Sequence, residues 1–180
     1  METKDCILSR RSIRTYSDKE ISNETIEEIV RTAQFAPSWK NSQTVSYVAI
    51  KDEKLKSEIA QNCVCGFEWN TNIINRSKVL MVQITANGIS GYNPDGTPTT
   101  AKGSHWQSFD AGLNAQTLCL AAFNLGIGSV ILGIIDEPEI KKLLNLGDEY
   151  SISTLIPLGY YEDVPQAPTR KPLSEVLTIM

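Results

Sequence analysis

The chain has 180 residues, 41% of them hydrophobic and 21% charged, which is enough for one domain with a sizeable core. Its net charge of −4 disfavours a general electrostatic attraction to nucleic acid or to an anionic membrane. No apolar run reaches the roughly 20 residues that span a bilayer. The first residues, 1–5, lack the basic-then-apolar order of a signal peptide. We therefore expect a single cytoplasmic domain over residues 1–180, with neither nucleic acid nor a membrane as its partner.

Cysteine and histidine are too few for most metal or acid–base sites. The chain has four cysteines and one histidine, His105. A structural zinc site needs about four ligands, and Cys63 and Cys65 would supply only half of them, so we expect no bound metal. A Ser-His-Asp triad would have to use His105, which no Gly-x-Ser-x-Gly turn precedes. Any chemistry should therefore depend on a bound cofactor.

Hydrophobic periodicity predicts a mixture of helices and strands. In chain order we expect a helix over 22–35, a strand over 45–50, a helix over 52–61, a strand over 79–86, a helix over 110–125, a strand over 128–135, a helix over 138–144 and a strand over 155–160. Ser22 is the expected N-cap of the first helix, and Pro37 ends it. The helix over 110–125 is apolar on most of its circumference, so it belongs in the core. Because no regular βαβ alternation is present, we assign the chain to the α+β class.

Two segments are not explained by packing alone. Residues 88–104 contain four glycines and two prolines, and a loop of this length is usually a lid, a binding loop or disordered. Residues 162–180 are rich in proline and end in an apolar stretch. That stretch must pack either on its own domain or on a partner, because termini are ordered only when they are tied down.

The densest cluster of charge lies near the N-terminus. Arg10, Arg11 and Arg14 fall within five residues, with Ser12 between them and no acidic residue between positions 5 and 18. Arginine forks match phosphate oxygens in bidentate geometry, and a serine hydroxyl adds a neutral donor. Arg170 could add a further positive charge from the far end of the chain. The alternatives are a phosphate site and a solvated basic turn.

A polar turn follows the first predicted helix. It contains, in order, Pro37, Ser38, Asn41 and Gln43. Asn and Gln side chains offer both a carbonyl acceptor and an amide donor, which the edge of a heteroaromatic ring needs, although the same residue types also build ordinary turns. A glycine pair at 126 and 128 follows a predicted helix rather than a strand, so we interpret it as a helix stop and not as a dinucleotide motif.

The order of these segments resembles that of the FMN-dependent nitroreductase family. Across residues 7–177 the chain carries, in order, Arg-Arg-Ser-Ile-Arg, Ala-Pro-Ser-x-x-Asn-x-Gln, a helix starting at Asp110, Leu-Gly-Ile-Gly-Ser, Leu-Gly-Tyr and Arg-Lys-Pro-Leu-x-Glu-Val. Each motif is weak alone, but their joint order and spacing are specific. The resemblance implies a nitroreductase-like α+β fold, with a central, mostly antiparallel sheet flanked by helices. It also implies a homodimer with FMN at the subunit interface and a C-terminal extension that packs on the partner subunit.

The resemblance further implies roles for individual residues. Those expected at the phosphate and ribityl chain of FMN are Arg10, Arg11, Ser12, Arg14 and Arg170. Those expected to reach the flavin from the neighbouring subunit are Pro37, Ser38, Asn41 and Gln43. Those expected beside the flavin ring are Asn72 at the pyrimidine edge, and Leu132 and Gly133 next to N5. The segment 88–104 is expected to line or cover the open face of the flavin.

The implied activity is that of an FMN-dependent oxidoreductase. NADH or NADPH would deliver hydride to flavin N5, and a nitroaromatic, quinone or similar small acceptor would then remove it in a ping-pong mechanism. No catalytic side chain is required, because the cofactor carries the chemistry. Two departures from the family pattern bear on substrate preference: Thr44-Val45 stands where many relatives have Pro-Trp, and Leu132 stands where one branch of relatives has an acidic residue.

Two alternative functions remain open on the sequence. One is a specialised enzyme of the same family, flavin-fragmenting or dehalogenating, that takes electrons from a separate donor protein. The other is a non-catalytic, flavin-binding redox sensor that uses Cys63 and Cys65.

Overall fold

A four-stranded antiparallel sheet forms the centre of the computed structural model, which describes residues 2–180. The strands are β1 (Val45–Ile50), β2 (Val79–Ala86), β3 (Ile127–Ser129) and β4 (Tyr150–Tyr160). They lie in the order β1-β2-β4-β3, and every neighbouring pair is antiparallel. The expected α+β class and its antiparallel sheet are therefore confirmed.

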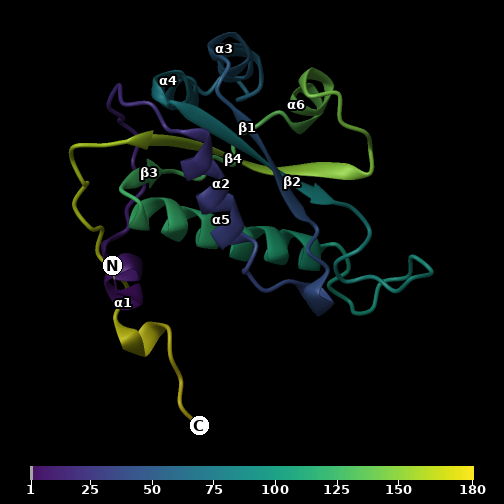
Figure 1. Cartoon of the computed structure of the whole chain (residues 1–180). Helices are drawn as coiled ribbons and strands as arrows, with labels where there is room; N and C mark the ends of the chain where they lie inside the picture. The colour runs from purple at the N-terminus through teal and green to yellow at the C-terminus, as the bar shows by residue number, and fades with distance from the viewer. Residues whose placement is uncertain (1) are drawn as a thin grey trace.

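Helices cover both faces of this sheet. They are α1 (Thr3–Ser9), α2 (Asn23–Ala33), α3 (Glu53–Asn62), α4 (Glu68–Arg76), α5 (His105–Asn124) and α6 (Glu137–Leu143), with short 3-10 turns η1 (Trp39–Asn41) and η2 (Leu173–Glu175). Figure 1 shows α3, α4 and α6 above the sheet and α2 and α5 below it. Over the described residues, no helix combines the length and apolar character needed to cross a membrane.

The protein has one hydrophobic core above the sheet and one below it, and strand β2 contributes side chains to both. Its residues alternate between faces, as side chains in a strand do. Leu80, Val82 and Ile84 pack with the helices above the sheet, whereas Val79 and Met81 pack with α2 and α5 below it. The strand is buried along almost its whole length, which confirms the prediction that both of its faces are covered.

The observed helix ends can be compared with those predicted from the sequence. The Ser22 hydroxyl accepts a hydrogen bond from the Thr25 amide at 3.2 Å, so the predicted N-cap of α2 is confirmed. Helix α5 begins at His105, five residues before the predicted start at 110. Within the added turn Trp106 packs edge-on against Phe109, three residues further along the helix, with ring centroids 5.6 Å apart. Helices α1 and α4 were not predicted, and α1 buries only Cys6 among its residues.

The strand expected over 128–135 was wrong beyond Ser129. Pro157 of β4 explains the break, because proline has no N–H to donate to the neighbouring strand. Its carbonyl oxygen is taken by the Tyr16 hydroxyl at 3.2 Å. Pairing resumes for one residue only, where the amides and carbonyls of Leu132 and Leu155 exchange hydrogen bonds of 2.8 and 3.2 Å.

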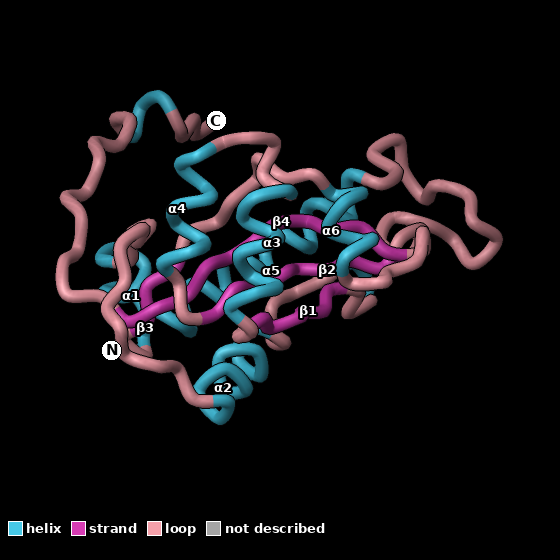
Figure 2. Tube along the Cα trace, turned by 90° about the horizontal axis from the view of Figure 1, so that it is seen from above, coloured by secondary structure: helices cyan, strands magenta, loops and turns pink. Residues whose placement is uncertain are grey.

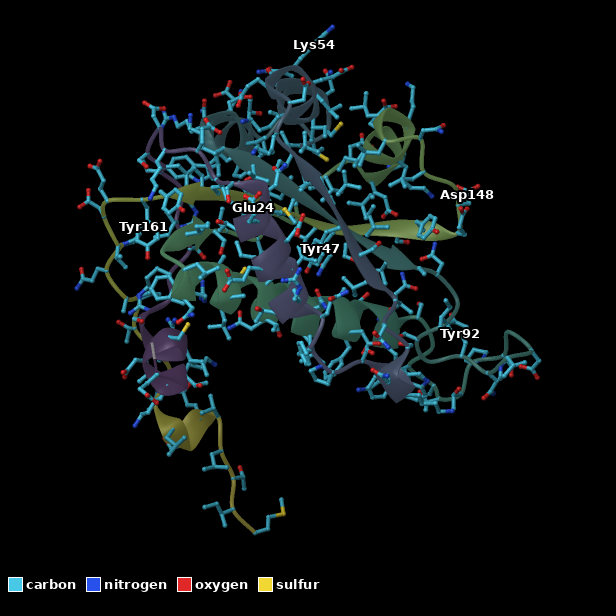
Figure 3. All side chains as sticks on the ribbon, viewed as in Figure 1. Glu24, Tyr47, Lys54, Tyr92, Asp148 and Tyr161 are labelled. Atoms are coloured by element: carbon cyan, nitrogen blue, oxygen red, sulfur yellow. The ribbon has the colours of Figure 1, made fainter. Side chains whose placement is uncertain are left out.

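The C-terminal residues run outside the layers. Figure 2 shows the chain leaving β4 and continuing as loop and one short turn. Every residue from 162 to 180 is exposed. Tyr161 lies where the chain leaves the sheet and stacks on Phe123, with ring centroids 6.2 Å apart (Figure 3). Packing of this tail on its own domain is therefore not observed.

Candidate functional site

The arginine cluster is held against strand β3. The Ile13 amide donates to the Ser129 carbonyl at 2.9 Å, and Ser12 forms a parallel bridge with Ser129. The contact is tight because a Cβ added at Gly128 would lie only 2.6 Å from the Cβ of Ile13. A glycine is therefore required on β3 for the segment 10–14 to lie in this place.

The guanidinium groups of this segment are free of carboxylates. Among residues 2–180, none of Arg10, Arg11, Arg14 and Arg170 lies within 4.0 Å of an acidic oxygen, whereas several lysines do. Arg14 donates only to the Ser12 carbonyl, at 3.2 Å. Unpaired guanidinium groups on a fixed backbone are suited to an anionic ligand such as phosphate.

Arg11 differs from its neighbours. Its guanidinium turns back onto the end of α1, where it donates to the carbonyls of Leu8 and Arg10 at 2.7 and 2.8 Å. Its Nε atom is buried and has no partner. The side chain therefore caps a helix, so the expected role of Arg11 at a phosphate falls to its backbone.

A cavity of about 440 Å³ adjoins the cluster. It is lined by Ser12, Arg14 and Tyr16 on one side and by the start of the C-terminal tail, residues 162–165, on the other. Arg170 does not line it, and its guanidinium donates to the Pro168 carbonyl at 2.9 Å. The structure of one chain thus brings Ser12 and Arg14 to this cavity, while the roles of Arg10, which does not line it, and of Arg170 stay predictions.

The segment after β3 continues from the cluster along β4. The Leu132 side chain is buried with Leu155 in the upper core, whereas Gly133 is exposed. Ile131 and Ile134 are 46% and 48% exposed, so two large apolar side chains face outwards here. The segment therefore offers a ligand its backbone and an apolar surface, and Leu132 contributes no side chain to it.

Asn70, rather than the predicted Asn72, lies beside this segment. Asn72 is exposed on α4, but Asn70 is buried and its amide donates to the Ile134 carbonyl at 3.3 Å. The sequence contained a signal for this difference. Asn70 shares the buried face of α4 with Ile73 and Ile74, at spacings of three and four residues.

The polar turn after α2 has an unusual backbone. Lys40, Asn41 and Gln43 have positive φ angles of 47°, 56° and 49°, a region that residues other than glycine rarely adopt. The Gln43 amide donates to the Ser38 hydroxyl at 3.0 Å, which closes the turn. Pro37, Ser38 and Gln43 line a cavity of about 220 Å³, whereas Asn41 is exposed and does not line it.

The two halves of the predicted site lie at opposite ends of the molecule. In Figure 1, α1 and β3 lie at one end, and η1, the loop before α5 and the start of α5 lie at the other. Figure 2 shows the same separation from above. One chain therefore cannot place Arg14 and Ser38 on the same small ligand, and a site with both requires a second copy.

Two buried tyrosines, Tyr16 and Tyr47, do not serve as acids or bases near neutral pH. Tyr47 donates to Asn114 and accepts from the Gln83 amide at 2.9 Å, beneath β1 (Figure 3). Burial raises the pKa of the Tyr47 phenol well above its ordinary value, and it does the same for the pKa of Tyr16. These groups orient neighbours by hydrogen bonding but remain protonated.

Comparison with known proteins decides the family. The model of the nitroreductase family matches residues 7–160. The chain belongs to the nitroreductase family. A putative NADH dehydrogenase/NAD(P)H nitroreductase of Archaeoglobus fulgidus is 30% identical over 161 residues, which cover 87% of this chain and 84% of the relative. The family named from the sequence is thereby confirmed.

Two further relatives indicate the range of this family. The iodotyrosine deiodinase of Nematostella vectensis is 26% identical, and the match covers 94% of this chain and 72% of that protein. A putative nitroreductase of Exiguobacterium sibiricum, solved in complex with FMN, has a TM-score of 0.84 and 19% identity over 100% of this chain and 98% of its own. The second likeness concerns the fold, since its sequence identity is low.

Proposed function

We propose that the protein is an FMN-dependent oxidoreductase that takes reducing equivalents from NADH or NADPH and passes them to a nitroaromatic, a quinone or a similar small acceptor. The single observation that carries this proposal is the free arginine cluster, which is fixed on β3 directly beside the exposed segment 131–134. The names of relatives as NAD(P)H nitroreductase and FMN reductase support it.

The residues present fit FMN. Arg10, Ser12 and Arg14 would hold its phosphate and ribityl chain, because their donors lack acidic partners and the cavity beside them is open. The backbone at Gly133 and the apolar side chains of Ile131 and Ile134 suit an uncharged ring system. The buried Asn70 would support the ring's surroundings indirectly, because its amide holds the Ile134 carbonyl at 3.3 Å.

FMN, when bound, supplies hydride transfer at its N5 atom. The chain then needs to bind and orient the two substrates in turn and to exclude water, and it needs no side-chain acid or base for that step. This agrees with the burial and protonation of Tyr16 and Tyr47 and with the burial of Leu132. A carboxylate at 132 would lie in the upper core, so a leucine there stabilises the fold.

The two FMN sites are proposed to lie in the interface of a homodimer. Each would combine the arginine cluster of one chain with Pro37, Ser38 and Asn41 of the other, because the two sets lie at opposite ends of one chain (Figure 1). Localisation in the cytoplasm, packing of the tail on the partner subunit and a single domain over 1–180 remain predictions.

An absorption spectrum of the purified protein tests the proposal directly. We expect flavin bands that bleach on anaerobic addition of NADH or NADPH and return on addition of a nitroaromatic or quinone. Steady-state kinetics should show parallel reciprocal plots, because the two substrates use the same face of the ring in turn. A colourless protein that does not bind added FMN would refute the proposal, and intersecting plots would refute the ping-pong part of it.

A second candidate function is reductive dehalogenation, which the deiodinase relatives favour. In this reaction a carbon–halogen bond of an aromatic ring is replaced by carbon–hydrogen, and two electrons and a proton are taken up as halide leaves. It predicts a flavin that NADH and NADPH do not bleach, but that releases iodide from an iodophenol after reduction by dithionite. Bleaching by NADH or NADPH together with no iodide release would exclude it.

A further inference from the structure

Asp110 connects three segments that are far apart in sequence. It lies on α5 and is only 2% exposed. Its carboxylate oxygen Oδ2 accepts a hydrogen bond from the Trp39 backbone amide at 2.9 Å and another from the Ser90 hydroxyl. Trp39 belongs to the polar turn and Ser90 to the loop 88–104, so a single oxygen joins turn, loop and helix.

The connection extends to the far side of the turn. Ser90 uses its proton for Asp110, so Ser42 is the donor in the 3.1 Å hydrogen bond between the two serine hydroxyls. Positions 39 and 42 of the turn are therefore both held by Asp110, one directly and one through Ser90. The indole rings of Trp39 and Trp106 add a contact, with centroids 4.8 Å apart.

A buried carboxylate is costly unless it is well satisfied. Among the described residues, no lysine, arginine or histidine lies within ion-pair distance of Asp110. The Trp39 amide and the Ser90 hydroxyl both donate to it, and hydrogen bonds to a carboxylate are about twice as strong as neutral ones. Both hydrogen bonds therefore act on or next to a turn in which Lys40, Asn41 and Gln43 have positive φ angles.

That segment needs such support. Lys40 and Asn41, between the two anchored positions, are both in the left-handed region, with φ of 47° and 56°. Backbone strain of this kind persists only where the surroundings over-determine it, and it is common at ligand-binding sites. Without Asp110 the Trp39 amide would lose its partner, and the turn could relax towards a less strained shape.

We propose that Asp110 is a positioning residue, which holds residues 38–43 in the strained shape that presents Pro37, Ser38 and Asn41 to the flavin of the partner subunit. This inference rests on the proposed function, because it assumes that FMN is the ligand the turn contacts. Asp110 acts through the Trp39 amide and Ser90, which it holds by hydrogen bonds.

The test compares Asp110→Ala and Asp110→Asn with Asp52→Ala as a matched control. Asp52 caps α3 by accepting the Leu55 amide at 2.7 Å, so its loss also removes a backbone-bonded carboxylate, but away from the turn. Release of FMN from the holoprotein on dilution gives the dissociation constant, and hydrogen exchange gives the protection of the Trp39 amide. Thermal unfolding of each variant measures its general loss of stability.

For Asp110→Ala we expect FMN binding to weaken by about tenfold to a hundredfold, because a relaxed turn must first return to the shape that binds FMN. The Trp39 amide should exchange faster by at least about tenfold, since its acceptor is gone. Asp110→Asn keeps an oxygen acceptor and should restore both readouts to within about threefold. Asp52→Ala should lower the unfolding temperature without changing either readout.

Two results would overturn the inference. One is wild-type FMN affinity and wild-type Trp39 protection in Asp110→Ala. The other is weaker FMN binding in Asp110→Ala and Asp52→Ala alike, in proportion to their loss of stability. If the wild-type protein binds no FMN, the proposed function fails on its own, and Trp39 exchange in the same variants still decides whether Asp110 holds the turn.

Discussion

Arg11 and Arg14 show how identical side chains receive different tasks from their surroundings. Both belong to the cluster that predicts a phosphate site. The Arg11 guanidinium donates to backbone carbonyls at the end of α1, because the last carbonyls of a helix have no partner within the helix. Arg14 bonds only the Ser12 carbonyl and is exposed, so most of its five donors are available to a ligand.

Arg14→Ala should therefore weaken FMN binding by about tenfold to a hundredfold, since it removes charge-assisted hydrogen bonds of about 1.5–3 kcal/mol. Fluorescence of FMN released on dilution measures this. Arg31→Ala is the matched control, because Arg31 is an exposed arginine on α2, 4.0 Å from Glu27. A variant at 14 that retains stoichiometric FMN through dilution would contradict the assignment.

The spacing of Cys63 and Cys65 suggested a redox-active pair, but the surroundings of the two thiols do not favour that role. Cys63 is buried, and burial raises the pKa of its thiol to about 11, so it is protonated at neutral pH. A protonated thiol is a poor nucleophile. Cys65 is exposed, with a φ of 52°. The pair is therefore poorly suited to redox sensing.

Replacement of Cys63 and Cys65 by serine should leave turnover with NADPH and a nitroaromatic within about twofold of the wild type, because neither thiol lies in the proposed site. Alkylation by iodoacetamide at neutral pH should modify Cys65 and spare Cys63. Loss of activity in the double variant, or fast alkylation of Cys63, would revive the redox-sensor alternative.

At the scale of elements, the contact between the arginine segment and β3 decides where the cluster lies. The segment has no strand or helix of its own. Its contact with β3 consists of the Ile13–Ser129 amide–carbonyl bond and the packing of Ile13 against Gly128, and the Tyr16 hydroxyl also donates to the Ile13 carbonyl at 2.8 Å. Ile13 is only 1% exposed, so it cannot move aside easily. The position of the proposed phosphate site therefore depends on a glycine, which has no side chain, at position 128 of β3.

Gly128→Ala should destabilise the protein by about 1–3 kcal/mol, the usual effect of overpacking a core. It should also weaken FMN binding, because the segment 10–14 must shift. Gly133→Ala is the control, since a Cβ there meets nothing within 4 Å and should leave the unfolding temperature unchanged. Thermal unfolding of both variants measures the difference, and equal melting temperatures would show that the contact is not tight.

At the scale of the whole molecule, the sheet and α5 separate the two halves of the proposed site. The arginine cluster is at the β3 end and the polar turn at the end where α5 begins, as Figures 1 and 2 show. The tail carries exposed apolar side chains, such as Leu173 at 68% and Ile179 at 87%, which a monomer would leave in water. Both features are expected of a chain that completes its site and buries its tail with a second copy.

Mixed dimers of Arg14→Ala and Asn41→Gly chains test this arrangement. Glycine suits the positive φ at 41, so that change removes only the side chain. In a shared site, one of the two sites in each mixed dimer combines an intact cluster with an intact turn, and about half of the FMN should bind with wild-type affinity. If each site belonged to one chain, every site would carry one defect and no wild-type fraction would appear in the titration.

The sequence by itself was enough to predict the family, the fold class and those helices and strands that are marked by local patterns. The Ser22 cap and the apolar run of β2 were predicted because neighbouring residues determine them. The spacing of Asn70 with Ile73 and Ile74 was a local signal for the buried face of α4, but that helix was not predicted, so Asn72 was chosen instead.

Only the tertiary structure decided the features that depend on distant residues. Strand β3 ends where its next residue would pair with Pro157 of β4. Pro157 lies 28 positions after Ser129 in the sequence, so a local pattern around β3 does not include it. The role of Asp110 depends on the meeting of α5 with a turn and a loop from elsewhere in the chain. Local pattern reports what each segment prefers, but which groups share a hydrogen bond or a ligand is determined by packing between segments.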